Sequence, residues 1–190
     1  MKIVCLDPSL SNTGFVVLQG TKGDWSLSNL GLLTTESSNA AALTKGRKDG
    51  IPKSKIATLK KNIDDLGRAK LLIEGLDKIV VDADYVCVEL PQIGGADMQA
   101  RSMWSSGIVL GIIANLKGPL VCVTPKDVKM VTGCATSSKE DMVSWATHLY
   151  PNAPWLKRKL KGEMVLLKTN HHIADALAAG VAGLTSINLW

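Results

Sequence analysis

The chain has 190 residues, of which 46% are hydrophobic and 21% charged, which excludes a disordered chain and predicts one globular domain spanning residues 1–190. The formal net charge of +5 favours a polyanionic partner without specifying which. The longest apolar run is too short for a membrane span, and the N-terminus opens into a strand and not a signal peptide. The four cysteines lack CxxC spacing, which predicts buried thiols in a reducing compartment. We therefore expect a cytoplasmic protein, in the host cytoplasm if a phage encodes it.

The first part of the chain predicts three strands and then a long helix. The strands fall at residues 2–8, 14–18 and 25–35, because short β-forming runs are separated there by turn residues. Residues 36–54 lose periodicity and predict a loop. From 56 to 80, apolar residues recur at spacings of three, four or seven, which is typical of one face of a helix.

The rest of the chain alternates between strands and helices. Strands are predicted at 85–90 and 120–123, with a helix at 97–116 between them, and further helices at 138–149 and 170–184. Three antiparallel strands followed by alternation is the element order of the ribonuclease-H-like fold. We therefore predict an α/β protein with a mixed five-stranded sheet, three antiparallel strands and then parallel additions, flanked by helices. In that fold the first strand is central and the fourth lies parallel beside it.

Two predicted strands carry an acid near their C-terminal end, at Asp7 and Glu89. A charge in a buried strand costs several kcal/mol unless something compensates it. If the two strands are parallel neighbours, both acids face the same end of the sheet, and the last helix can bring Asp175 against them. Three converging carboxylates are typical of a site for a divalent cation.

Each acid also has a simpler interpretation when it is taken alone. Asp7 precedes Pro8 and fits a turn, Glu89 fits a buried ion pair, and Asp175 fits an exposed helix position. The neighbouring histidines 171 and 172 fit a helix start capped by Asn170. The joint occurrence of all these residues in one order favours the metal site.

Four segments of the chain resemble the motifs of the RuvC-type Holliday-junction resolvases. They are Leu6-Asp7-Pro8 with the later Thr13-Gly14, then Val88-Glu89, then residues 125–139 with Lys126, Lys129 and Lys139, and finally residues 172–178. Together they span nearly the whole chain in the family's order. The resemblance implies a divergent member of this family: a ribonuclease-H-like homodimer that uses Mg²⁺ to nick four-way DNA junctions symmetrically.

The resemblance, together with the preference of Mg²⁺ for carboxylate oxygens, predicts a site for two metal ions. Asp7 is expected to be shared by both ions, with Glu89 on one and Asp175 on the other. The family motif favours His172 as the fourth group, through metal contact or by orienting water. His171 lies four residues before Asp175, so helical spacing also allows it to reach the same face. Mn²⁺ is expected to substitute for Mg²⁺.

The expected DNA contacts are basic side chains from several parts of the chain. Three match the third family motif, others belong to a basic cluster after the third strand, and one lies near Trp104 in an apolar helix that suggests a subunit contact. A solvated charged face is the alternative for the basic cluster. The candidates are Lys45, Arg47, Lys48, Arg101, Lys126, Lys129 and Lys139.

We therefore predict a Mg²⁺-dependent, structure-selective endodeoxyribonuclease that resolves four-way and other branched DNA junctions by paired symmetric nicks. A flap nuclease or an RNA–DNA hybrid nuclease of the same fold is an alternative, as is a branched-DNA-binding protein without catalysis. Gln92 stands three residues after Glu89, where bacterial members often carry a Phe that stacks on a junction base.

Overall fold

The computed structural model of the chain describes residues 1–35, 53–91 and 100–190. Within these ranges, no helix combines the length and apolarity needed to cross a membrane. The strands are β1 (Lys2–Asp7), β2 (Asn12–Thr21), β3 (Asp24–Thr34), β4 (Tyr85–Glu89), β5 (Leu120–Val123), β6 (Lys157–Leu160) and β7 (Glu163–Leu166). The helices are α2 (Lys53–Val80), α3 (Ala100–Ala114), α4 (Pro125–Met130), α5 (Lys139–Leu149) and α6 (Asn170–Ser186).

The sheet has the predicted topology. Its strand order is β3-β2-β1-β4-β5, with β1 central. β1 pairs antiparallel with β2 and parallel with β4, and β5 extends the sheet in parallel beside β4. The predicted mixed five-stranded sheet with flanking helices is confirmed, as is the pairing of the first and fourth strands.

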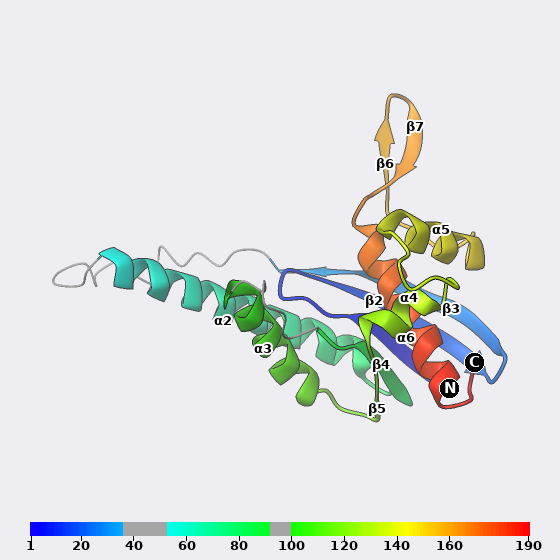
Figure 1. The fold of residues 1–190 in the computed structure, drawn as a ribbon, viewed down its shortest axis with the longest axis horizontal. Helices are drawn as coiled ribbons and strands as arrows, with labels where there is room; N and C mark the ends of the chain where they lie inside the picture. The colour runs from blue at the N-terminus through cyan, green and yellow to red at the C-terminus, as the bar shows by residue number, and fades with distance from the viewer. Residues whose placement is uncertain (36–52, 92–99) are drawn as a thin grey trace.

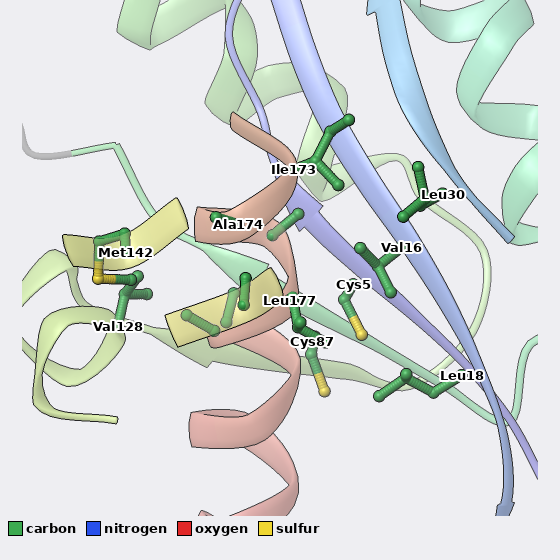
Figure 2. Close-up of a cluster of buried hydrophobic side chains, with 14 of the residues drawn as sticks. Cys5, Val16, Leu18, Leu30, Cys87, Val128, Met142, Ile173, Ala174 and Leu177 are labelled. Atoms are coloured by element: carbon green, nitrogen blue, oxygen red, sulfur yellow. The ribbon is translucent and has the colours of Figure 1, made fainter. Parts of the chain in front are cut away.

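Helices cover both faces of this sheet (Figure 1). α2 and α3 lie over one face and share a core cluster with it, whereas α6 lies on the opposite face with α4 and α5 outside it. The central strand is consequently buried from both sides: Ile3 and Cys5 belong to the α6 side, and Val4 and Leu6 to the other. Figure 2 shows the α6 side, where Leu177 lies near Cys5 and Cys87.

Small residues let α6 approach the sheet closely. A Cβ added at Gly14 on β2 would lie 2.0 Å from the carbonyl oxygen of His172. On the helix itself, a Cβ at Gly180 would lie 2.3 Å from the sulfur of Cys5, and one at Gly183 2.8 Å from the sulfur of Cys87. Real Cβ contacts are not this short, so the position of α6 depends on glycine at these three points.

Two short elements were not anticipated from the sequence. α4 has only six residues, too few to show a helical period, although its start carries a capping box between Thr124 and Asp127. β6 and β7 form a separate antiparallel hairpin, where the sequence shows only the basic run Lys157-Arg158-Lys159. Its turn is Lys161-Gly162, and both residues have positive φ, as a tight two-residue hairpin turn requires.

The prediction of four buried cysteines is wrong for two of them. Cys5 and Cys87 are buried, but Cys122 and Cys134 are exposed, and all four are free thiols. β5 is the edge strand, and its alternation turns Val121 and Val123 toward the α6 side. Cys122 therefore points to the opposite face, at the open edge of the sheet.

Replacing Gly14 by Ala tests the close approach of α6. The added methyl group meets helix backbone, which cannot move aside as a flexible side chain can, so we expect unfolding free energy to fall by about 3 kcal/mol or more. Gly107→Ala on α3 is the control, because a Cβ there meets nothing within 4 Å. That change should raise stability by about 0.5–1 kcal/mol. Urea unfolding measures both, and an equal response of the two variants would contradict the packing argument.

Candidate functional site

The end of the sheet where β1 and β4 finish holds the first two acids. The register pairs Leu6 with Val88, so the next residues, Asp7 and Glu89, lie level on neighbouring parallel strands. Side chains alternate along a strand, and Cys5 and Cys87 face α6. Asp7 and Glu89 therefore point to the same face, toward the start of α6.

α6 adds a histidine and the third acid. His172 lies in the first turn of the helix, and its Nδ1 donates a hydrogen bond to Asp7 Oδ2 at 2.7 Å. Both side chains keep limited access to solvent, with exposed fractions of 21% for His172 and 18% for Asp7. Asp175 follows one turn later on the same face of the helix, half-buried, and close enough to interact with both Asp7 and Glu89.

The turn after Asp7 is fixed by its own side chains. The hydroxyl of Thr13, fully buried, donates to the carbonyl of Ser9 at 2.8 Å and accepts from the Ser9 amide at 3.1 Å. These bonds reverse the chain so that Gly14 pairs with Asp7. Asp7 is the last residue of β1, and its carboxylate bonds to His172, so turn formation alone does not explain it.

The carboxyl groups raise one another's pKa. Burial raises the pKa of Glu89 to about 8, and the charges of Asp7 and Asp175 add to that rise, while Lys129 opposes it. Burial and then Asp7 raise the pKa of Asp175 to about 7. No salt bridge among the described residues involves Glu89 or Asp175, so a buried ion pair does not account for Glu89.

The two neighbouring histidines face different partners. His171 Nδ1 donates to the carbonyl of Lys168 at 2.7 Å, and its Nε2 lies 3.2 Å from the ammonium of Lys139. Burial lowers the pKa of His171, in keeping with a neutral ring that accepts from Lys139. The structure therefore brings His172 onto Asp7 and turns His171 toward α5.

The other predicted residues that the structure describes lie on α3, α4 and α5. Lys126, Lys129 and Lys139 are exposed on α4 and α5. Arg101 donates from both terminal nitrogens to Asp65, whose carboxylate also accepts from Trp104 Nε1 at 3.1 Å, so this arginine joins α3 to α2. Lys45, Arg47, Lys48 and Gln92 lie outside the described residues.

Asn170 has a different role from the predicted helix cap. Thr169 precedes the helix without a side-chain cap, and Asn170 is fully buried as the first helical residue. Its side-chain oxygen accepts from the Leu156 amide at 3.0 Å. Its side-chain nitrogen donates to the carbonyls of Leu156 at 2.7 Å and Leu167 at 3.0 Å. Asn170 thus ties both ends of the β6–β7 hairpin to the start of α6.

A groove beside the site was not anticipated from the sequence. It has a volume of about 660 Å³ and runs between α5 and the segment that leads from β7 into α6. Lys139, Lys168 and His171 line it together with Leu166. The only sequence signal for it was the proximity of Lys168 to the two histidines.

The donor set matches a divalent cation in chemical type. Among the described residues, no group of three or more His, Cys, Asp or Glu side chains lies close enough to hold a metal ion as it stands. One oxygen of Asp7 is hydrogen-bonded to His172. The three carboxyl groups nevertheless share one end of the sheet, and two of them have raised pKa values. A bound cation would relieve this mutual repulsion. Carboxylate oxygens are also the ligands that hard divalent ions prefer.

The comparisons with known proteins bear on the fold. No protein-family model matches the sequence, and no curated protein sequence matches it. A structure of T. thermophilus RuvC in complex with a Holliday junction substrate matches with a TM-score of 0.62 and 16% identity, covering 99% of this chain and 95% of that one. A second Thermus thermophilus RuvC structure matches with a TM-score of 0.56 and 16% identity, over 100% and 98% of the two chains. The chain has the fold of RuvC. This RuvC-like fold confirms the architecture predicted from the element order.

The raised pKa of Glu89 makes stability depend on pH when metal is chelated. With a folded pKa of about 8 against an ordinary 4.5, the folded chain holds a proton in this window that the unfolded chain releases. Stability therefore decreases as pH rises from about 4.5 to about 8. Glu89→Gln should remove this contribution and make the protein more stable than wild type at the upper end by a few kcal/mol.

Urea unfolding in EDTA at a series of pH values measures the difference between wild type and Glu89→Gln. Glu74→Gln, at an exposed position on α2, is the control and should leave the pH profile unchanged. A difference between wild type and Glu89→Gln that does not grow with pH would show that Glu89 is not held in this environment.

Proposed function

We propose that this chain is a divalent-metal-dependent endodeoxyribonuclease that acts on branched DNA, chiefly four-way junctions, by paired symmetric nicks. The observation that carries the proposal is the gathering of Asp7, Glu89, Asp175 and His172 at one end of the RuvC-like sheet. A second support is the shared fold, since the similar structure of T. thermophilus RuvC is a complex with a Holliday junction substrate. The two observations are independent of each other, because the first concerns the side chains of this chain and the second concerns the path of its backbone.

Asp7, Glu89 and Asp175 are the residues that would hold the metal ions, with Mg²⁺ the expected ion and Mn²⁺ a substitute. Two such ions supply an activated water and neutralise charge on the attacking and leaving oxygens of a phosphodiester. Glu89 on the strand and Asp175 on the helix both interact with Asp7, which fits its assignment as the shared ligand. His172 donates to Asp7, so it would hold that carboxylate in place beside the metal ions.

Lys129 and Lys139 provide positive charge at the rim of this centre. Lys129 lowers the pKa of both Glu89 and Asp175, and Lys139 lowers that of Asp175, so both lysines act on the acids through space. Each is exposed and forms no salt bridge among the described residues. Their ammonium groups are therefore available to the phosphates of a DNA strand entering the site.

A homodimer fits the proposed reaction. Cutting two strands at symmetric positions requires two sites related by a two-fold axis, which a pair of identical subunits provides. α3 supports this with large exposed apolar side chains, since Met103 is 47% and Trp104 54% exposed. Light scattering on the purified protein measures the oligomeric state.

Asp7→Asn is the central test of the metal chemistry. The amide keeps the size of the side chain but removes the charge that binds the ions, so cleavage of a synthetic four-way junction should be lost while junction binding is retained. Asp82→Asn is the control: it is exposed, lies away from the site, and has a positive φ that Asn tolerates. Cleavage is measured with metal chelated and with Mg²⁺ or Mn²⁺ restored.

The same assay distinguishes the alternative functions. Flap, nicked-duplex and RNA–DNA hybrid substrates are compared with the junction, and a preference for one of them would redirect the substrate assignment. Binding without cleavage of any substrate would favour a branched-DNA-binding protein. Retained cleavage by Asp7→Asn would refute the mechanism itself.

Comparing the two histidines tests the assignment of His172. His172→Ala removes the donor to Asp7, and we expect cleavage to fall about 10- to 100-fold, as for other residues that orient a metal ligand. His171→Ala removes contacts to Lys139, Lys168 and the ring of His172 but no bond to an acid of the site, so it should reduce cleavage much less. Single-turnover rates at saturating Mg²⁺ measure both, and the reverse order would assign the fourth position to His171.

A further inference from the structure

The β6–β7 hairpin has one face that carries cations and exposed apolar side chains. Cross-strand pairing puts Lys157 opposite Leu166 and Lys159 opposite Met164, so these four side chains share a face, hereafter the lysine face. The other face carries Arg158 and Leu160, which are also exposed, together with Glu163 and Val165. The only acid of the hairpin strands therefore lies on the face away from the two lysines.

The lysine face is open to solvent. Met164 is 63% and Leu166 40% exposed, and both lysines are exposed as well. The hairpin extends away from the body of the protein next to α5 and α6 (Figure 1). Apolar side chains this exposed on a two-stranded hairpin gain little from packing within the described chain, which indicates a surface for a partner.

The lysine face continues into the groove beside the site. Leu166 belongs to this face and also lines the groove, along with Lys139, Lys168 and one acid, Glu140. Lys139 in turn lies beside His171 and lowers the pKa of Asp175. A row of cations therefore runs from the hairpin through the groove to the acids, which suits a polyanion that must reach them.

The hairpin is held in a fixed relation to the site. Leu156 and Leu167, the residues at its two ends, are joined by a hydrogen bond of 2.9 Å from the Leu167 amide to the Leu156 carbonyl. Asn170 binds both of them and begins the helix that carries His172 and Asp175. Whatever binds the hairpin is consequently placed at a set distance from the acids.

We propose that the lysine face and the adjoining groove bind a DNA arm next to the scissile strand. Lys157 and Lys159 contact successive phosphates, and Met164 packs against sugars or bases between them. This inference rests on the proposed function, since it takes DNA as the substrate of the acid site. It adds the β6–β7 hairpin, which none of the family motifs includes.

The salt dependence of DNA binding tests this surface. With metal chelated, Kd for a synthetic four-way junction is measured by fluorescence anisotropy at a series of KCl concentrations. The double variant Lys157→Ala/Lys159→Ala should bind more weakly, and the slope of log affinity against log salt should fall by about 1.8, since each lost phosphate contact contributes about 0.9. Met164→Ser should weaken binding without changing this slope, because it removes no charge.

Two further variants separate charge from position and folding. Lys157→Arg/Lys159→Arg keeps the charges and should bind like wild type. Lys22→Ala/Lys117→Ala removes the same number of exposed charges at the opposite end of the sheet and should change the salt slope little. Thermal unfolding should give the same midpoint for all of these variants, because each substituted side chain is exposed.

The outcomes distinguish this inference from the proposed function. If wild type cleaves junctions and the Lys157→Ala/Lys159→Ala variant binds with unchanged Kd and slope, the hairpin surface is refuted, a protein partner is indicated instead, and the nuclease function stands. If wild type cleaves no branched substrate but that variant loses affinity and slope, the DNA-binding surface stands and the nuclease proposal fails. Wild type that does not bind DNA refutes both.

Discussion

The packing of α6 directly on the sheet is the constraint on which the site depends. Burial, and then repulsion from the neighbouring carboxylates, raises the pKa values of Glu89 and Asp175, so the acids do not assemble the site themselves. Their positions come from the contact of helix backbone with Gly14 and of Gly180 and Gly183 with the strand cysteines. Burial of apolar surface around these contacts stabilises an arrangement that its charges alone would oppose.

The lysines near the acids are placed so that they do not occupy the position of a bound cation. An ammonium group inserted between the acids would neutralise them and satisfy their oxygens, leaving little reason to bind metal. Lys129 and Lys139 instead lie at the rim, where they lower the acids' pKa values only partly. His172 binds one oxygen of Asp7, and no salt bridge within residues 1–35, 53–91 and 100–190 engages Glu89 or Asp175.

Much of this arrangement was predictable because it follows from strand geometry. The order of the elements, taken with the strand arrangement of the ribonuclease-H-like fold, places Asp7 and Glu89 at the same end of the sheet, and the observed register sets them level. The choice between the histidines was different, because it depends on the rotation of α6, which the glycine contacts set. Exposure of Cys122 was also hidden, since it requires knowing that β5 is an edge strand. The β6–β7 hairpin is too short and polar to show a period.

The buried side-chain amide of Asn170 links α6, which the sequence predicts, to the β6–β7 hairpin, which it does not predict. An apolar residue there would leave the Leu156 amide without its acceptor, at a cost of about 1–3 kcal/mol, whereas the carbonyls of Leu156 and Leu167 would each keep one backbone donor. Such a network fixes geometry more than it adds stability. Because Asn170 also begins the helix of His172, the hairpin cannot tilt without straining the turn that carries the histidine. The hairpin is therefore built as an extension of the site and not as an independent loop.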